Sequence, residues 1–263
     1  MNQSPIGIID SGLGGLTVWR SIRSLLPHES TIFIGDHKFV PYGKKSKAVI
    51  RKRVLKILSY LYVRGAKLIV IACNTATVAG IEWYRSEMPN IPIIGVVPVI
   101  KTAAEVSKSK KFVVISTPFT TRSKYQKDLI KKFAPHARVF ALSTPKLVEL
   151  VEDGNITGPK ANKILKSILD PFVKKGIDVV VLGSTHFAFL KESIRAIVGD
   201  GAAVLDSGGA VARQVKRVLE TRGELAGVSD ATTVFYTTGN PKIVSAASKR
   251  LMGSELVFSY ANI

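Results

Sequence analysis

The chain has 263 residues, 46% of them hydrophobic, and a formal net charge of +19 from 38 Lys and Arg against 19 Asp and Glu. This length allows one large domain or two small ones, and the apolar content argues against a disordered chain. No apolar run approaches the roughly 18 residues of a membrane-spanning helix, and the first residues show no secretory signal. The single cysteine excludes an intramolecular disulfide and a cysteine-rich zinc site. We therefore expect a cytoplasmic protein.

Short apolar runs alternate with amphipathic stretches along the whole chain. The runs are rich in Val and Ile with little alternation, which is typical of strands covered on both faces. In chain order, strands are expected at 6–9, 31–34, 68–72, 93–97, 112–116, 138–142, 179–182, 203–205 and 233–236. Helices are expected at 16–25, 47–64, 76–87, 100–107, 122–133, 160–174, 191–198 and 210–221. This order predicts an α/β fold with a mostly parallel sheet.

The strand–helix pattern occurs twice. Segment 68–75 (Leu-Ile-Val-Ile-Ala-Cys-Asn-Thr) is similar to segment 179–186 (Val-Val-Val-Leu-Gly-Ser-Thr-His), and 6–11 is similar to 113–117. Two pseudosymmetric doubly wound α/β domains explain this doubling. A single doubly wound sheet of nine or so strands is the plainer alternative.

Ligands of parallel α/β sheets bind beyond the carboxyl ends of strands, so the residues at those ends are the candidates for function. Segment 10–17 (Asp-Ser-Gly-Leu-Gly-Gly-Leu-Thr) follows the first strand, and its glycines permit a tight turn with free N–H groups. Asp10 is either an acid, base or orienting group, or only a helix cap. The spacing is not the dinucleotide fingerprint. Segment 40–43 (Val-Pro-Tyr-Gly) follows Asp36 and is either a ligand contact or an ordinary turn.

Cys73 stands at the mouth of the third strand, ahead of a helix whose dipole is expected to lower its pKa. A buried structural thiol is the alternative. His186 follows Ser184 and is a candidate general acid or base; a helix cap with a bystander histidine is the alternative. Glu152 could pair with His186 and raise its pKa, or be a solvent-facing carboxylate. No histidine pair has metal-ligand spacing, so no metal site is expected.

Together these segments resemble the glutamate racemase family, in the same order and at similar spacing. Segments 6–17, 35–36, 40–43, 71–77 and 182–187 carry the resemblance, with shorter matches at 93–96 and 205–207. The resemblance implies two α/β domains, the second inserted into the first, with the active site in the cleft between them. The expected boundaries are 1–97 with 208–263 for the first domain and 98–207 for the second.

The resemblance further implies a cofactor-free isomerase that supplies D-glutamate for peptidoglycan, and hence for cell shape. Family members often form homodimers, and some bind DNA gyrase. By position, the catalytic residues would be Asp10, Cys73, Glu152, Ser184 and His186. The substrate-binding residues would be Ser11, Tyr42, Gly43, Asn74, Thr75 and Thr185.

The sequence departs from the family at Ser184, which occupies the second catalytic cysteine position; Thr144 also replaces a usual cysteine. Racemisation without a cofactor needs a proton acceptor on one face of the α-carbon and a donor on the other. A serine hydroxyl is a much weaker acid than a thiol and needs an adjacent base. The resemblance thus implies a glutamate racemase, or a variant of one that is impaired at its second base unless another base substitutes.

Two alternatives stay open. The first is a single-cysteine decarboxylase of substituted malonates, which has a related fold and needs only one proton donor. The second is a non-catalytic binding protein that associates with gyrase or nucleic acid, since a charge of +19 attracts anions. The basic residues lie in separate segments and form no zinc-finger or RNP motif, so any nucleic-acid association is expected to be weak and nonspecific.

Overall fold

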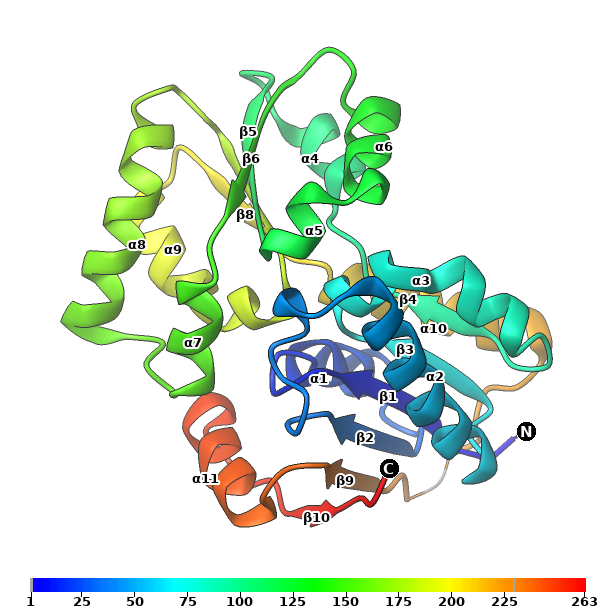
Figure 1. Ribbon diagram of the computed structural model, residues 1–263. Helices are drawn as coiled ribbons and strands as arrows, with labels where there is room; N and C mark the ends of the chain where they lie inside the picture. The colour runs from blue at the N-terminus through cyan, green and yellow to red at the C-terminus, as the bar shows by residue number, and fades with distance from the viewer. Residues whose placement is uncertain (1, 229) are drawn as a thin grey trace.

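The computed structural model describes residues 2–228 and 230–263 as two parallel β-sheets with helices on their faces (Figure 1). The larger sheet has the strand order β10-β9-β2-β1-β3-β4, and the smaller sheet has the order β6-β5-β7-β8. Every strand pairing is parallel. The prediction of two parallel-sheet α/β units is confirmed, and the single-sheet alternative is wrong.

The larger sheet contains β1 (Ile6–Asp10), β2 (Thr31–Gly35), β3 (Leu68–Ile71), β4 (Ile93–Gly95), β9 (Thr233–Thr237) and β10 (Phe258–Tyr260). The smaller sheet contains β5 (Lys111–Ser116), β6 (Arg138–Ser143), β7 (Val179–Gly183) and β8 (Ala203–Leu205). The helices are α1 (Leu16–Leu25), α2 (Lys47–Val63), α3 (Asn74–Glu87), α4 (Ile100–Val106), α5 (Pro118–Arg122), α6 (Lys124–Phe133), α7 (Lys146–Glu152), α8 (Gly158–Val173), α9 (Lys191–Val198), α10 (Gly208–Arg222) and α11 (Pro241–Met252). Two 3₁₀ segments, η1 (Tyr42–Lys44) and η2 (Thr185–Leu190), complete the chain.

The doubling predicted from the sequence is visible in the strand order. The larger sheet contains the run β2-β1-β3-β4, and the smaller sheet repeats it as β6-β5-β7-β8. Strand β5 is therefore the counterpart of β1, and β7 is the counterpart of β3. The chain leaves the larger sheet after β4 and returns to it with β9. The domain boundaries at 97 and 208 stay a prediction, and residues 1 and 229 lie outside the described residues.

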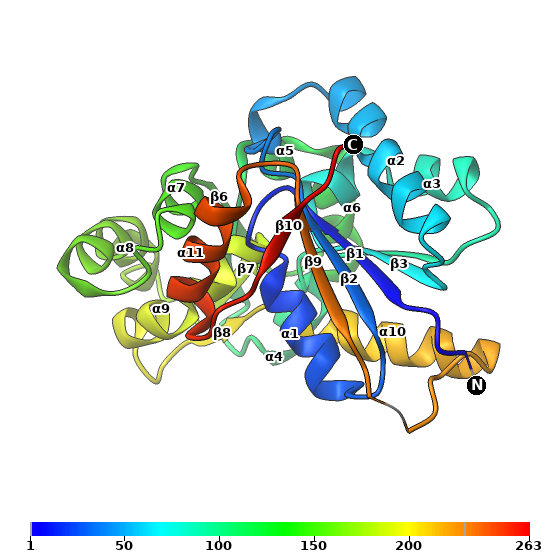
Figure 2. The same ribbon diagram turned by 90° about the horizontal axis from the view of Figure 1, so that it is seen from below.

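Side chains of the central strand β1 alternate between two apolar layers. Ile6 and Ile8 belong to a cluster with α1 and α10, whereas Ile9 packs in a second cluster with α2 and α3. Figure 2 shows α1 and α10 on one face of the larger sheet and α2 and α3 on the other. The first cluster also contains Val113 and Leu182 of the smaller sheet. A continuous buried core therefore joins the two units and fixes the ends of their strands relative to each other.

Four helices and one strand differ from the sequence-based expectation, and α5 and α7 are two helices that it did not include. The helix expected at 122–133 is divided at Ser123, whose side chain accepts a hydrogen bond from the backbone of Gln126 and so begins α6. Helix α11 was not predicted, although Asn240 caps it and Pro241 occupies its first turn. Strand β10 was not predicted either. It has only three residues at the edge of the sheet, too few to show the sequence pattern of a strand.

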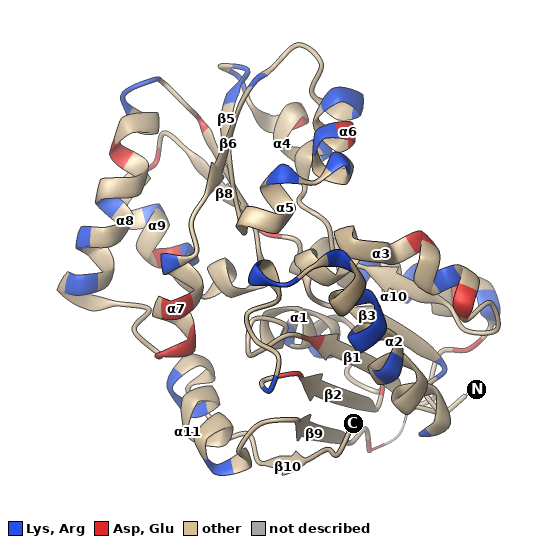
Figure 3. Ribbon diagram, in the orientation of Figure 1, with Lys and Arg blue, Asp and Glu red and all other residues tan. Residues whose placement is uncertain are grey.

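Basic side chains are distributed over both units. Figure 3 shows Lys and Arg on α2, α6, α8 and α11, which do not form one face. The high net charge thus arises from several separate helices. Within the described part of the chain, no helix is both long and apolar enough to cross a membrane.

Candidate active site

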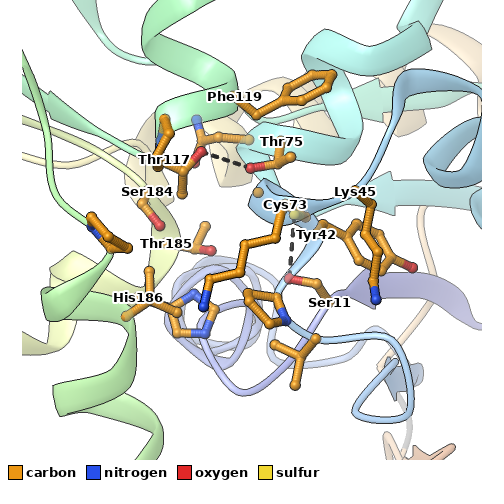
Figure 4. A pocket seen from close by; sticks show the side chains of 18 of the residues that line it. Ser11, Tyr42, Lys45, Cys73, Thr75, Thr117, Phe119, Ser184, Thr185 and His186 are labelled. Atoms are coloured by element: carbon orange, nitrogen blue, oxygen red, sulfur yellow. Dashed lines mark hydrogen bonds between the residues drawn. The ribbon is translucent and has the colours of Figure 1, made fainter.

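A pocket of about 360 Å³ lies where the carboxyl ends of the two sheets meet. It is lined by one residue following each of β1, β3, β5 and β7, namely Ser11, Cys73, Thr117 and Ser184. Figure 4 shows Cys73 and Ser11 on one side of this space and Ser184 on the other. The volume falls in the range of roughly 300–1,000 Å³ that small-molecule sites occupy. The pseudosymmetry of the fold therefore places Cys73 and Ser184 in matching positions.

The structure gathers all the predicted site residues in and around this pocket. Asp10 and Glu152 lie behind its wall. The Thr185 hydroxyl donates to Oδ2 of Asp10 at 3.0 Å, and Nε2 of His186 lies 2.5 Å from Oε1 of Glu152. Of the predicted residues, those that line the pocket directly are Ser11, Tyr42, Gly43, Cys73, Asn74, Thr75, Ser184, Thr185 and His186.

Cys73 is the N-cap residue of α3 and is 6% exposed, with its Sγ 3.5 Å from the Ser11 hydroxyl. Burial, followed by the negative charge of Asp10, raises the pKa of the Cys73 thiol to about 12. The expectation that the helix dipole lowers this pKa is therefore wrong, because desolvation of the thiolate outweighs the dipole. Burial, more than the charge of Asp10, therefore favours the thiol over the thiolate.

Replacing Asp10 by Asn is expected to lower the pKa of Cys73 and to speed its alkylation by iodoacetamide severalfold at pH 9. The charge that opposes the thiolate is removed, while the intrinsic reactivity of the thiolate falls slightly with its pKa. Ser11→Ala is expected to have the opposite effect and to slow alkylation, because the Ser11 hydroxyl lowers the Cys73 pKa. Since the chain has one cysteine, the alkylation rate reports this thiol alone. Equal alkylation rates in Asp10→Asn and Ser11→Ala would show that Asp10 does not control the pKa of the Cys73 thiol.

Ser184 precedes η2 and is 5% exposed. Its side chain does not cap that segment, and no hydrogen bond to its hydroxyl occurs among residues 2–228 and 230–263. Thr185 instead contacts Asp10, and His186 contacts Glu152. The capping alternative for Ser184 and Thr185 is therefore wrong. His186 makes no hydrogen bond to Ser184 within the described residues, so the serine lacks the adjacent base that would activate it.

Glu152 and His186 form a mostly buried pair. Burial alone would lower the pKa of His186, but the hydrogen bond and charge of Glu152 outweigh it and raise this pKa. Burial would raise the pKa of Glu152, but the hydrogen bond and charge of His186 hold it at about 2. Oε1 of Glu152 also accepts a hydrogen bond from the backbone of Leu13 at 3.1 Å. The pair therefore fastens the glycine-rich turn after β1 to α7 and η2.

This pair is expected to make stability depend on pH. The pKa of Glu152 falls from 4.5 to about 2, so its stabilising contribution is complete above pH 4.5 and is lost as pH falls toward 2. The pKa of His186 is raised, so its contribution is complete below its ordinary value of 6.5 and is lost as pH rises through the folded value. The stabilisation by this pair should therefore be complete between pH 4.5 and 6.5. Below that range, the free energy of unfolding of the unmodified chain, measured with urea, should fall by up to roughly 3 kcal/mol.

Glu152→Gln should remove most of this dependence of the free energy of unfolding on pH. Glu149→Gln, on the same helix but with a 65% exposed side chain, should retain it. Superimposable profiles for the two variants would show that the Glu152–His186 pair does not carry the pH dependence.

Tyr42 contributes its ring to the pocket wall, while its hydroxyl is engaged elsewhere. The hydroxyl donates to Oδ2 of Asp36 at 2.6 Å, and Arg53 donates two hydrogen bonds to the same carboxylate. Asp36 is fully buried and also accepts a hydrogen bond from Thr238 at 2.7 Å. These bonds fix the turn that carries Tyr42 and Gly43 against the pocket.

The sequence-based reasoning missed several residues of this site, among them Thr117 and His37. Thr117, the counterpart of Ser11 in the second unit, has its hydroxyl 2.9 Å from that of Thr75. The similarity of segments 6–11 and 113–117 was the signal that could have found it. His37 lies with Nε2 4.0 Å from Oε2 of Glu152, and burial lowers its pKa. No local pattern marks His37, because the contact depends on the folded chain.

The described residues contain no group of three or more His, Cys, Asp or Glu side chains that could hold a metal ion. The side chains in and around the pocket include one thiol, several hydroxyls, an imidazole, three carboxylates and three basic groups.

The Asp/Glu/hydantoin racemase family model matches residues 6–215 of the chain. The chain belongs to this family. The glutamate racemase of Ectopseudomonas mendocina is 38% identical over 257 residues, covering 97% of this chain and 98% of that protein. The predicted resemblance is confirmed, and the similarity extends over nearly the whole chain.

Solved structures of this racemase family have the same fold. The glutamate racemase of Bacillus anthracis superposes with a TM-score of 0.91 at 30% identity, covering 100% of this chain and 99% of the other. The glutamate racemase of Francisella tularensis, in complex with D-glutamate, gives a TM-score of 0.86 at 28% identity, covering 100% of this chain and 98% of the other. The two-sheet arrangement is thus that of family members crystallised as glutamate racemases.

Proposed function

We propose that this racemase-family chain is a cofactor-independent glutamate racemase whose proton transfer is impaired on one face of the substrate. Its similarity to glutamate racemases over nearly the full length supports glutamate as the substrate. The impairment rests on one observation. Cys73, the only cysteine of the chain, follows β3, and its pseudosymmetric counterpart after β7 is Ser184.

The proposed reaction is a proton exchange at the α-carbon. The Cys73 thiolate takes the α-proton of one enantiomer and becomes a thiol, and the electron pair stays on the substrate as a carbanion. Return of a proton from Cys73 restores the same enantiomer, with solvent hydrogen where the thiol has exchanged. Inversion requires a proton from the opposite face, where Ser184 offers only a weakly acidic hydroxyl. Exchange should therefore be much faster than inversion.

Donors and charges around the pocket support an acidic amino acid as substrate. Nδ2 of Asn74 is buried without a hydrogen-bond partner among the described residues, so it is free to donate to a carboxylate. Lys44, Lys45 and Arg122 line the pocket against a single carboxylate, Glu149. A substrate ammonium group beside Asp10 would offset the charge that raises the Cys73 pKa.

Proton NMR of D- and L-glutamate with the protein in deuterated water tests this proposal. We expect loss of the α-proton signal from one enantiomer, D-glutamate, with slow or absent inversion in a chiral assay. Rapid inversion of both enantiomers would contradict the impairment. If neither enantiomer exchanges, the glutamate assignment fails, and release of carbon dioxide from substituted malonates becomes the next test because a decarboxylase needs only one thiol.

Four further expectations stay predictions: D-glutamate supply for peptidoglycan, a cytoplasmic location, a homodimer, and weak gyrase or nucleic-acid association.

A further inference from the structure

His37 follows β2 of the larger-sheet unit, and its ring is directed toward Glu152 of α7 in the smaller-sheet unit. Its Nδ1 lies 2.8 Å from the hydroxyl of Thr237 and 3.2 Å from the carbonyl oxygen of Gly35. A carbonyl oxygen only accepts hydrogen bonds, so the neutral ring carries its hydrogen on Nδ1. A Cβ at Gly35 would come within 2.5 Å of the ring, and one at Gly239 within 2.8 Å of the His37 Cβ. The two glycines therefore leave room for a histidine held in one orientation and one tautomer.

The other ring nitrogen of His37, Nε2, is buried and has no hydrogen-bond partner among the described residues. It lies 4.0 Å from Oε2 of Glu152. Because Nδ1 carries the hydrogen, Nε2 and Oε2 are both acceptors and face each other unpaired. The other carboxylate oxygen, Oε1, is engaged by His186 and by the backbone of Leu13. One added proton on Nε2 would turn this contact of two acceptors into a charge-assisted hydrogen bond, after a closure of about 1 Å.

Such a bond would act on a helix that forms part of the pocket wall. Helix α7 belongs to the smaller-sheet unit and supplies Val148 and Glu149 to the pocket. An ionic contact already reaches this helix from the larger-sheet unit, since Nζ of Lys44 lies 3.8 Å from Oε1 of Glu149. Both of those side chains are exposed, so solvent weakens their attraction. The side chains of His37 and Glu152 are only 10% and 22% exposed, so a charge on His37 would be screened much less.

The charged groups that face His37 come from three elements: Glu152 from α7, Asp10 from the end of β1 and His186 from η2. The neighbouring strand β9 contributes the uncharged Thr237. Burial lowers the pKa of His37, and the negative charge of Glu152 is the largest influence that opposes it. The ring is therefore neutral at pH 8 and takes its proton below its ordinary value of 6.5. The pKa of His186 is raised instead, so this cluster takes up two protons in sequence, first on His186 and then on His37.

We propose that His37 is a positioning residue of this site, whose protonated ring joins the two units by donating from Nε2 to Oε2 of Glu152. The proton comes from solvent and returns to it when the pH rises. In the joined state, α7 holds Val148 and Glu149 against the pocket, so acid should tighten the binding of a ligand. The bridge itself does not depend on the function proposed above, whereas the choice of D-glutamate as the ligand rests on it.

Proton NMR of the histidine ring hydrogens tests the bridge without any substrate. The chain has four histidines, and the signal that is absent from His37→Asn belongs to His37. In Glu152→Gln the pKa of His37 should fall by at least about half a pH unit, because the charge that favours its imidazolium is removed. In Glu149→Gln, on the same helix, it should stay within about 0.2 pH units of the parent. A His37 pKa that is equal in these two variants would overturn the proposal.

Calorimetric titration with D-glutamate at pH 5.5 and pH 8.0 tests the effect on the pocket. On going to pH 5.5, the Kd should fall at least about threefold further in the parent than in His37→Asn, which keeps a donor near the position of Nδ1 but has no atom at Nε2. His37→Gln separates a bridge from a merely structural role, because its amide nitrogen lies near the position of Nε2 and donates at every pH. It should lose the effect of acid, yet bind at pH 8.0 at least as tightly as the parent. It also serves if His37→Asn fails to fold.

His28→Asn is the matched control, since His28 is exposed and lies between α1 and β2. This variant should keep the full effect of acid on the Kd. An equal effect of acid in the parent and in His37→Asn, or an equal loss of it in His28→Asn, would overturn the proposal. Binding by His37→Gln at pH 8.0 that is weaker than that of the parent would also overturn it. If D-glutamate binds at neither pH, the proposed function fails, and the NMR titration still decides whether the bridge exists.

Discussion

Replacing Ser184 by cysteine is expected to raise the rate of glutamate inversion by about 10²- to 10⁴-fold, the range that a positioned proton donor contributes to catalysis. The change supplies a thiol at the counterpart of Cys73, on the opposite side of the pocket. Ser184 is 5% exposed and its hydroxyl has no hydrogen-bond partner among the described residues, so a slightly larger sulfur atom breaks no existing hydrogen bond. Chiral chromatography of D-glutamate formed from L-glutamate measures the effect.

Thr144→Cys is the control for that experiment. Thr144 is also buried, and it precedes Pro145 at the edge of the same pocket. This substitution introduces a second thiol into the smaller-sheet unit without placing it at the end of β7. We expect no gain in inversion from it. If Ser184→Cys also leaves inversion unchanged while the protein stays folded, the position after β7 is not that of the second proton donor.

The sequence was sufficient to predict the parts of this site that depend on local patterns. Buried Val and Ile runs located the central strands, and the similarity of the segments around Cys73 and Ser184 predicted the two-unit fold. Each of these signals lies within a short stretch of chain. The carboxyl ends of parallel strands meet at one edge of a sheet, so their residues could be assigned to one site before the structure was known.

Other properties of the site could not be predicted, because they depend on contacts between distant segments. The thiol of Cys73 stood at a helix start, yet burial and Asp10 together decide its pKa. The hydroxyl of Tyr42 binds Asp36 rather than facing the pocket. His37 is held by the hydroxyl of Thr237 at 2.8 Å, a contact between residues two hundred positions apart. Desolvation and pairing of this kind have no signature in sequence spacing.

Exchanging the two side chains, in the double variant Cys73→Ser with Ser184→Cys, is expected to reverse which enantiomer of glutamate exchanges its α-proton. The parent has its thiol after β3, and the double variant has its thiol after β7. Because the two positions lie on opposite sides of the pocket, each thiol reaches the α-carbon from a different face. Exchange on the original enantiomer should fall by about 10²- to 10⁴-fold, and exchange on its mirror image should appear.

Cys73→Ser alone separates this reversal from a general loss of the site. It leaves a serine at both positions and should abolish exchange on both enantiomers, while binding of glutamate is retained because the donors of Asn74 and the carboxylate of Asp10 are unchanged. The two faces are not equivalent: Asp10 and Ser11 act on the thiol after β3, whereas Thr185 and His186 follow the position after β7. The reversed exchange should therefore have a different pH dependence. Exchange that stays on the original enantiomer in the double variant would show that a group other than Cys73 removes the proton.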